Sequence, residues 1–296
     1  MKKIIALAVA GAFALPAVAD ITISGEIEYY YQNEQDAEDT LQDAESNLFI
    51  TGTSELDNGF TLTGKMFFRN TDNTILDEGG SNLTFGMGDL GTLAVGDNAG
   101  AVDKFDEYAN LTAQKGAYTK GKDAAIVYTL PQLVEGLTVV YGMTPAGGST
   151  IGGSTGEVTA DLESIGAEYS FADGSAYYGV DTYTASGSES EQTKMGVEYS
   201  VAGFTLGFET LELRDDTGAS TAEQDNDYLA LAYSTGPLTL VYSTVSAKTD
   251  GADVNDQEIL TAFYTLGSGV TAYVENEQDA VSSETDSTIV GVEYKF

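Results

Sequence analysis

The chain has 296 residues, of which 47 are acidic and 12 are lysine or arginine, so its formal net charge is −35; it contains no cysteine, histidine or tryptophan. Such acidity excludes nucleic acid as a partner, because phosphate binding requires clustered basic side chains. Without imidazole or thiol groups the usual acid–base and metal-binding chemistry is missing. We therefore expect no enzyme and no catalytic, cofactor or metal site, apart from divalent cations such as Ca²⁺ held by acidic loops.

Residues 1–19 have the pattern of a cleaved signal peptide. Lys2 and Lys3 precede an apolar run over 4–15, and an A-x-A sequence at 17–19 ends the segment. The run is shorter than the roughly 20 residues of a membrane-spanning helix. We expect an exported chain that begins at Asp20, with 20–296 as one domain. Its formal charge changes from −35 to −37, because the leader carries two lysines and no acid.

The rest of the sequence repeats one theme, a segment of about ten residues in which apolar and small or polar side chains alternate, and this period of two predicts β-strands. Helical character is mild and confined to 101–114, inside the longest connection. Sixteen strands are expected, at 21–31, 46–55, 60–69, 81–88, 92–97, 123–130, 137–143, 161–170, 175–184, 191–200, 203–213, 227–235, 237–247, 257–265, 270–276 and 287–296.

The breaks between these segments alternate between two kinds. Short ones carry turn residues, as in "LDNGF" (56–60) and "FADGS" (171–175). Long ones are acidic, as in 32–45 and 276–286. Alternate connections of an antiparallel meander lie at opposite ends of the sheet, so one end should carry tight turns and the other long, negatively charged loops.

Three features favour a membrane barrel over a soluble sandwich. Tyrosines recur near strand ends, as in the aromatic belt at a bilayer interface. The segments match a tilted membrane strand and exceed the globular norm of about five or six residues. No sheet edge can stay open in lipid, so 287–296 must pair with 21–31. We predict an all-β, sixteen-stranded antiparallel transmembrane β-barrel, in which the carboxylate of Phe296 pairs with the amine of Asp20.

The sequence resembles the general diffusion porins of Gram-negative bacteria over essentially its whole length. The final "VEYKF" (292–296) is similar to the C-terminal signature of these barrels. The stretch "GTLAVGDNAGAVDKFDEYANL" (91–111) is similar to the strand that leads into their third long loop. The resemblance implies a homotrimer in the cell outer membrane, in contact with outer-membrane lipid and lipopolysaccharide, whose third loop folds into the barrel and narrows the channel.

In that family a basic wall faces the acids of the infolded loop. Lys65 and Arg69 alternate with Met66 and Phe68, so both should face the lumen as the basic wall. The alternative is that 101–114 forms an external loop and that Lys65 and Arg69 pair locally. The acids opposite the basic wall would be Asp97, Asp103, Asp106 and Glu107 of the loop. Further inward charges on the strands would set the electric field of the pore, and these include Lys194, Glu198, Asp181 and Glu275.

A barrel of this size leaves an aqueous lumen. We therefore predict passive diffusion of ions and small hydrophilic solutes, with cation selectivity because low-dielectric walls focus the field of the acids. A solute-specific channel, for instance for a sugar, would need an aromatic track, with Tyr30, Tyr177, Tyr183 and Tyr273 as candidates. A secreted acidic β-domain that binds Ca²⁺ or glycans is the further alternative, although the sequence contains no EF-hand pattern.

Overall fold

A computed structural model of the chain describes residues 20–35, 38–71, 74–104, 111–113, 123–145, 161–185, 188–216, 221–281 and 286–296. The signal peptide predicted at 1–19 lies outside the described residues and stays a prediction. Among the residues that are described, no helix is long and apolar enough to cross a membrane.

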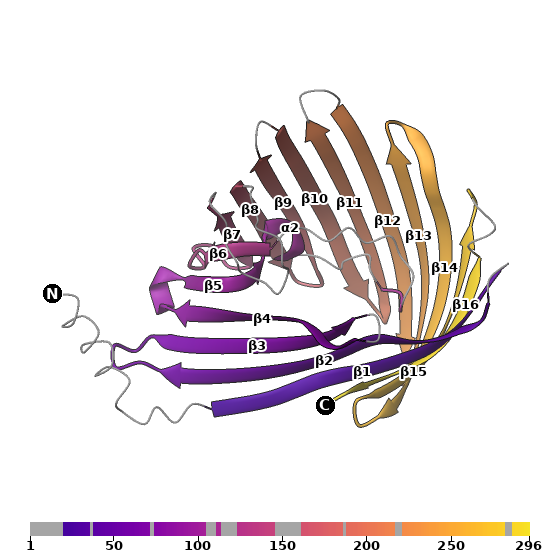
Figure 1. Cartoon of the computed structure of the whole chain (residues 1–296), viewed down its shortest axis with the longest axis horizontal. Coiled ribbons are helices and arrows are strands. Elements are labelled where there is room, and N and C mark those ends of the chain that lie inside the picture. Colours follow the sequence, from indigo (N-terminus) through magenta and orange to yellow (C-terminus); the bar gives the residue numbers. More distant parts are fainter. Residues whose placement is uncertain are drawn as a thin grey trace.

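The described residues form sixteen strands in one closed antiparallel barrel, in which each strand pairs with its neighbours in sequence and β16 returns to β1 (Figure 1). This confirms the predicted fold class, and every predicted strand overlaps an observed one. The strands are β1 (Asp20–Glu34), β2 (Thr40–Glu55), β3 (Thr61–Thr71), β4 (Thr74–Gly86), β5 (Thr92–Ala99), β6 (Asp123–Thr129), β7 (Leu137–Thr144), β8 (Asp161–Phe171), β9 (Gly174–Ala185), β10 (Ser188–Val201), β11 (Phe204–Asp216), β12 (Thr221–Thr235), β13 (Leu238–Thr249), β14 (Ala252–Gly267), β15 (Val270–Asp279) and β16 (Ser287–Lys295), with the short helices η1 (Gly88–Leu90) and α2 (Ala101–Lys104) beside β5.

The two ends of the barrel differ less than the breaks in the sequence predict, because β3–β4, β9–β10 and β13–β14 at the loop end are also separated by only two residues each. At one end β8–β9, β10–β11, β12–β13 and β14–β15 are joined by two residues each. In the β10–β11 turn Ala202 (φ 51°) and Gly203 (φ 86°) are both left-handed, which is the conformation that a tight two-residue hairpin requires. At the other end the strands run further into the acidic stretches than predicted.

These extensions correct the sequence prediction at the loop end. β2 begins at Thr40 where a start at 46 is predicted, and β14 begins at Ala252 where 257 is predicted. Acidic residues there join the ladder because they pair across strands: Asp253 lies opposite Lys248, with 3.7 Å between Oδ1 and Nζ. In the β2 extension both faces carry mostly polar residues, which hides the alternation that marks a strand in the sequence, whereas in the β14 extension Ala252 and Val254 do alternate with polar residues.

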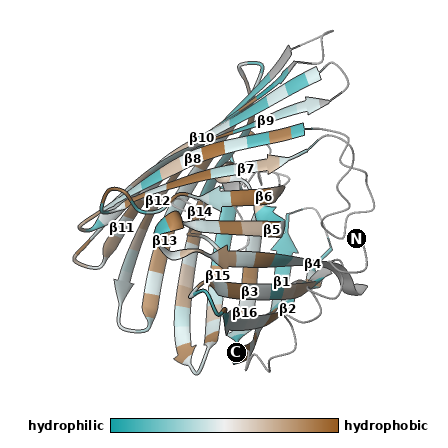
Figure 2. Cartoon of the chain, turned by 90° about the vertical axis from the view of Figure 1, so that its left-hand side faces the viewer, coloured by the Kyte–Doolittle hydropathy of each residue, from teal (hydrophilic) through white to brown (hydrophobic). Residues whose placement is uncertain are grey.

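The two faces of the sheet carry different side chains. On β10 the large apolar residues point outward, with Met195, Val197 and Tyr199 between 40% and 46% exposed. On the opposite face of the same strand Gln192 and Lys194 are 3% and 1% exposed. Figure 2 shows this alternation of hydrophobic and hydrophilic positions along the strands. An apolar exterior around a polar interior is the arrangement of a barrel whose outer surface contacts hydrocarbon.

The barrel is closed by Phe296, as predicted, but against a different partner. Gly25 and Phe296 exchange both backbone hydrogen bonds, at 3.0 Å each. A Cβ on Gly25 would lie 2.8 Å from Cζ of Phe296, so the absence of a side chain makes room for the ring. Asp20 instead pairs with Thr53 of β2. It lies about 16 Å from Gly25 along the strand, at about 3.3 Å per residue, so the predicted pairing of Asp20 with the carboxylate is wrong.

Candidate functional site

Inward-facing side chains on β8–β15 are buried even though they face the barrel interior. Asp181 on β9 and Glu275 on β15 are both 0% exposed. Their cover comes from the connection that follows β5. Its first turn, α2, lies inside the curve of the sheet and packs against β8 and β9 (Figure 1). The interior therefore has a covered side, formed by β8–β15.

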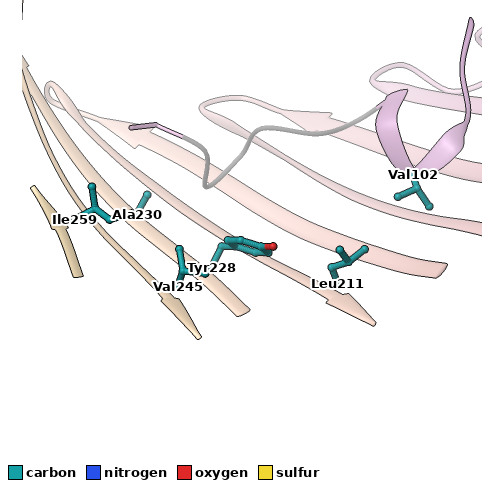
Figure 3. Packing of buried hydrophobic residues seen from close by; sticks show 6 residues of the cluster. All are labelled: Val102, Leu211, Tyr228, Ala230, Val245 and Ile259. Atoms are coloured by element: carbon teal, nitrogen blue, oxygen red, sulfur yellow. The ribbon is translucent and has the colours of Figure 1, made fainter. Parts of the chain in front are cut away.

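The cover is partly apolar. Val102 of α2 is 0% exposed and belongs to one hydrophobic cluster with inward residues of four strands (Figure 3). Leu111, further along the same connection, packs against this cluster. Because apolar side chains on an inner wall would otherwise face water, the connection stabilises that wall by covering them. The strand members of the cluster are Leu211, Tyr228, Ala230, Val245 and Ile259.

A buried carboxylate holds the start of the connection. The Ala101 N–H donates to Oγ of Ser164 on β8. The Ser164 hydroxyl donates to Oδ1 of Asp181 at 2.5 Å, and the Val102 N–H reaches the same oxygen at 3.4 Å. Gly179 allows this approach, since a Cβ there would lie 2.9 Å from the Ala101 carbonyl oxygen.

A second buried carboxylate holds residue 113 of the same connection. Oε2 of Glu275 accepts the Ala113 N–H at 2.6 Å and the Thr261 hydroxyl at 2.7 Å. Hydrogen bonds to an ionised acceptor are stronger than neutral ones. We expected Asp181 and Glu275 to set the field of the pore. Their 0% exposure shows that they face the connection instead.

Lys65 and Arg69 lie on the inner face of β3, on the wall formed by β1–β4. The register places Lys65 opposite Thr51 and Arg69 opposite Asn47, whose side chain donates to Glu26 Oε1 at 2.6 Å. The Lys65 ammonium lies 4.5 Å from the ring centroid of Phe49, and the Arg69 guanidinium carbon lies 5.1 Å from that of Phe67. Their inward direction agrees with the sequence prediction. Their role in a constriction stays a prediction.

The structure describes only some of the residues predicted to form the acidic side of the constriction. Asp97 lies on the same wall as the basic residues, not opposite them, because a bulge between Val95 and Asn98 turns its carboxylate toward Gly80 and Phe67. Asp103 is the third residue of α2, and its side chain is not described. Asp106 and Glu107 lie outside the described residues, so their roles remain predictions.

Lys194 and Glu198 both lie on the inner face of β10, but they differ in access. Lys194 is 1% exposed and its Nζ lies 3.1 Å from Oε1 of Glu209. Glu198 is partly exposed near the tight-turn end. Lys194 therefore belongs to the covered side and offers no free charge to a solute. Among the described residues, no group of three or more acidic side chains is arranged to hold a metal ion.

One family model matches the sequence, and several solved structures share its fold. The family model described as Gram-negative porin matches residues 6–283. The fold is similar to OmpF of Salmonella typhi in complex with daunomycin, with TM-score 0.76, 15% identity and coverage of 94% of this chain and 98% of that one. It is also similar to the anion-selective porin of Comamonas acidovorans, with TM-score 0.72, 15% identity and coverage of 94% and 100%. The trimer form of OmpT of Vibrio cholerae gives TM-score 0.69 at 13% identity, with coverage of 94% and 99%. No curated protein sequence matches the chain.

Proposed function

We propose that this chain, which belongs to the Gram-negative porin family, forms a cation-selective channel for ions and small hydrophilic solutes. Its family and its closed barrel point to passive diffusion across the outer membrane and not to catalysis. The observation that carries the proposal is the distribution of side chains, with large apolar residues outside and charged residues inside one closed sheet.

The proposed aqueous path runs along the wall of β1–β4. The contacts of Val102, Leu111 and Ala113 with the inner faces of β11–β15 support an infolded third loop that occupies the opposite side. Such a loop would narrow the lumen and leave Lys65 and Arg69 beside the path. An external loop, the alternative interpretation, would not bury Asp181 and Glu275 on an inner face.

The proposed cation preference follows from the charges on the inner face. Among the described inward positions, the cationic residues are Lys65, Arg69, Lys194 and Lys295. Without the buried groups, the cationic residues are Lys65, Arg69 and Lys295, and the carboxylates still outnumber them and include Glu26, Asp97, Glu168, Glu198 and Glu293. Low-dielectric walls focus such a field and raise the local concentration of cations.

Reversal potentials test the proposal. The detergent-purified protein is inserted into a planar bilayer, and the zero-current potential is measured under a KCl gradient. We expect a potential of the sign that K⁺ permeation produces. A potential of the opposite sign would contradict cation selectivity, and failure of the folded protein to conduct would contradict the channel itself.

We also propose a homotrimer in contact with lipid and lipopolysaccharide. A solved structure similar to this chain is described as the trimer form of OmpT of Vibrio cholerae, which supports this oligomeric state. The mass of the detergent complex, measured by native mass spectrometry, tests it. A monomer at all detergent concentrations would contradict the proposal.

A further inference from the structure

Two cationic residues of the inner wall are held differently from the other cationic residues whose side chains the structure describes. Lys194, Lys248 and Lys295 each lie within 4.0 Å of a carboxylate, and Arg214 contacts both Glu212 and Glu223. Lys65 and Arg69 form no ion pair with any described residue and instead lie over phenyl rings. This difference is unexpected in a chain with 47 acids and 12 cationic residues.

The rings and cations form one patch on β2 and β3. Phe49 lies directly opposite Phe67 in the register, and both share the inner face with Lys65 and Arg69. All four side chains are partly exposed. Gly80, opposite Phe67 on β4, has no side chain where the Phe67 ring and the Asp97 carboxylate lie. The position of the Phe67 ring therefore depends on the glycine beside it.

A phenyl ring and a carboxylate can both hold a cationic side chain, but they differ in how much of its electric field remains at a distance. A carboxylate partner carries a full negative charge and cancels the field of the cation at a distance. A phenyl ring attracts the cation through its quadrupole and has no net charge. Lys65 and Arg69 are thus fixed on the wall while their positive charge remains uncompensated by any described residue.

We infer that Phe49 and Phe67 are positioning residues that keep Lys65 and Arg69 away from the surrounding carboxylates, so that two positive charges persist beside the ion path. This inference rests on the proposed function. By keeping the charges of Lys65 and Arg69 uncompensated, the rings reduce the cation preference that the acidic interior produces. Without its ring, Lys65 would turn to a carboxylate and its charge would be compensated.

Reversal potentials of four variants test the inference at Lys65. A unit charge about 6 Å from the path in water changes the local concentration of a monovalent ion about threefold. We expect Lys65→Met to raise the K⁺/Cl⁻ permeability ratio about tenfold, because the positive charge lowers the local K⁺ concentration and raises the local Cl⁻ concentration about threefold each. Phe49→Leu should raise it in the same direction, Phe49→Tyr should match the wild type because it keeps a ring, and Phe49→Leu combined with Lys65→Met should match Lys65→Met alone.

The double variant separates a positioning role from a general structural one. If Phe49→Leu merely distorted the barrel, it would change the ratio in the Lys65→Met background as well. Phe68→Leu is the control for the loss of a ring, because Phe68 is adjacent to Phe67 in sequence and lies on the outer face of β3. Phe67→Leu, Arg69→Met and their combination form a second, independent double-mutant cycle with the same expected pattern.

The inference is overturned if Phe49→Leu leaves the permeability ratio unchanged or lowers it, or if its effect persists without Lys65. It is also overturned if Lys65→Met has no effect, because the charge would then not act on the path. These failures differ from failure of the proposed function, in which the wild-type protein itself would not conduct or would prefer anions.

Discussion

Replacing Glu275 with glutamine tests whether the connection after β5 is held inside the barrel. Glu275 Oε2 accepts two hydrogen bonds, from Ala113 N–H at 2.6 Å and from Thr261 Oγ at 2.7 Å, and the residue is 0% exposed. A hydrogen bond to a charged group contributes about 1.5–3 kcal/mol, and a neutral one contributes about 0.5–1.5 kcal/mol. The neutral amide keeps the shape of the side chain and weakens both bonds.

Only the bond from the Ala113 N–H is lost when the connection leaves the wall, and the substitution weakens this bond by about 1.3 kcal/mol. A loss of this size raises the ratio of released to held connection about tenfold, since each 1.4 kcal/mol is about a factor of ten. Single-channel recordings measure this ratio. We expect the wild type to show one steady level and Glu275→Gln to show excursions to a second level of higher conductance, as the connection leaves the lumen.

Glu293→Gln is the matched control. Glu293 lies on the inner face of β16 and its Oε1 lies 2.7 Å from the ammonium of Lys295, so this variant removes an inward charge without touching residue 113. It should shift the selectivity slightly and leave the steady level intact. Identical recordings from Glu275→Gln and Glu293→Gln would refute the reasoning, because Glu275 would then act only as one more interior charge.

Three further changes have defined outcomes. Deletion of 103–116 should raise the single-channel conductance, and an unchanged conductance would indicate a connection outside the lumen. Val102→Asp places a charge in a hydrophobic cluster where Val102 is 0% exposed, at a cost of several kcal/mol. Bilayer recordings of this variant should show the same second conductance level as Glu275→Gln, and a steady wild-type level would contradict the packing of Val102. Gly25→Val should reduce the folded fraction seen by heat-modifiable gel mobility, because a Cβ there meets Phe296 at 2.8 Å, whereas Gly52→Val, with open space around its Cβ, should fold normally.

The strands could be predicted from the sequence because the alternation of side chains is a local property. Met195, Val197 and Tyr199 point the same way in any strand, whatever lies beside it. The same locality explains the errors at the loop end, where strands such as β2 continue into segments that are polar on both faces. The turns were predictable for a similar reason, since Gly203 and its neighbours adopt left-handed conformations that few residue types favour.

The site was harder to predict because it depends on pairing between distant segments. The register that places Phe296 opposite Gly25, and not near Asp20, has no signature within either strand. A single bulge reverses the direction of Asp97, and a bulge is invisible to a period of two. The roles of Asp181 and Glu275 depend on partners 79 and 162 residues away in sequence. The sequence alone does not distinguish an inward carboxylate that is buried from one that is exposed to water.

The covered side of the interior has a consequence for how the molecule tolerates change. Inward positions of β11–β14, such as Leu211 and Ile259, are enclosed like the core of a water-soluble protein. Polar replacements there should hinder assembly. Equivalent replacements on β2 and β3 should leave assembly intact and alter what permeates. On the proposed path along β1–β4, one barrel would combine a half that maintains the fold with a half whose side chains can change without loss of assembly, and the passage for solutes would lie off-centre.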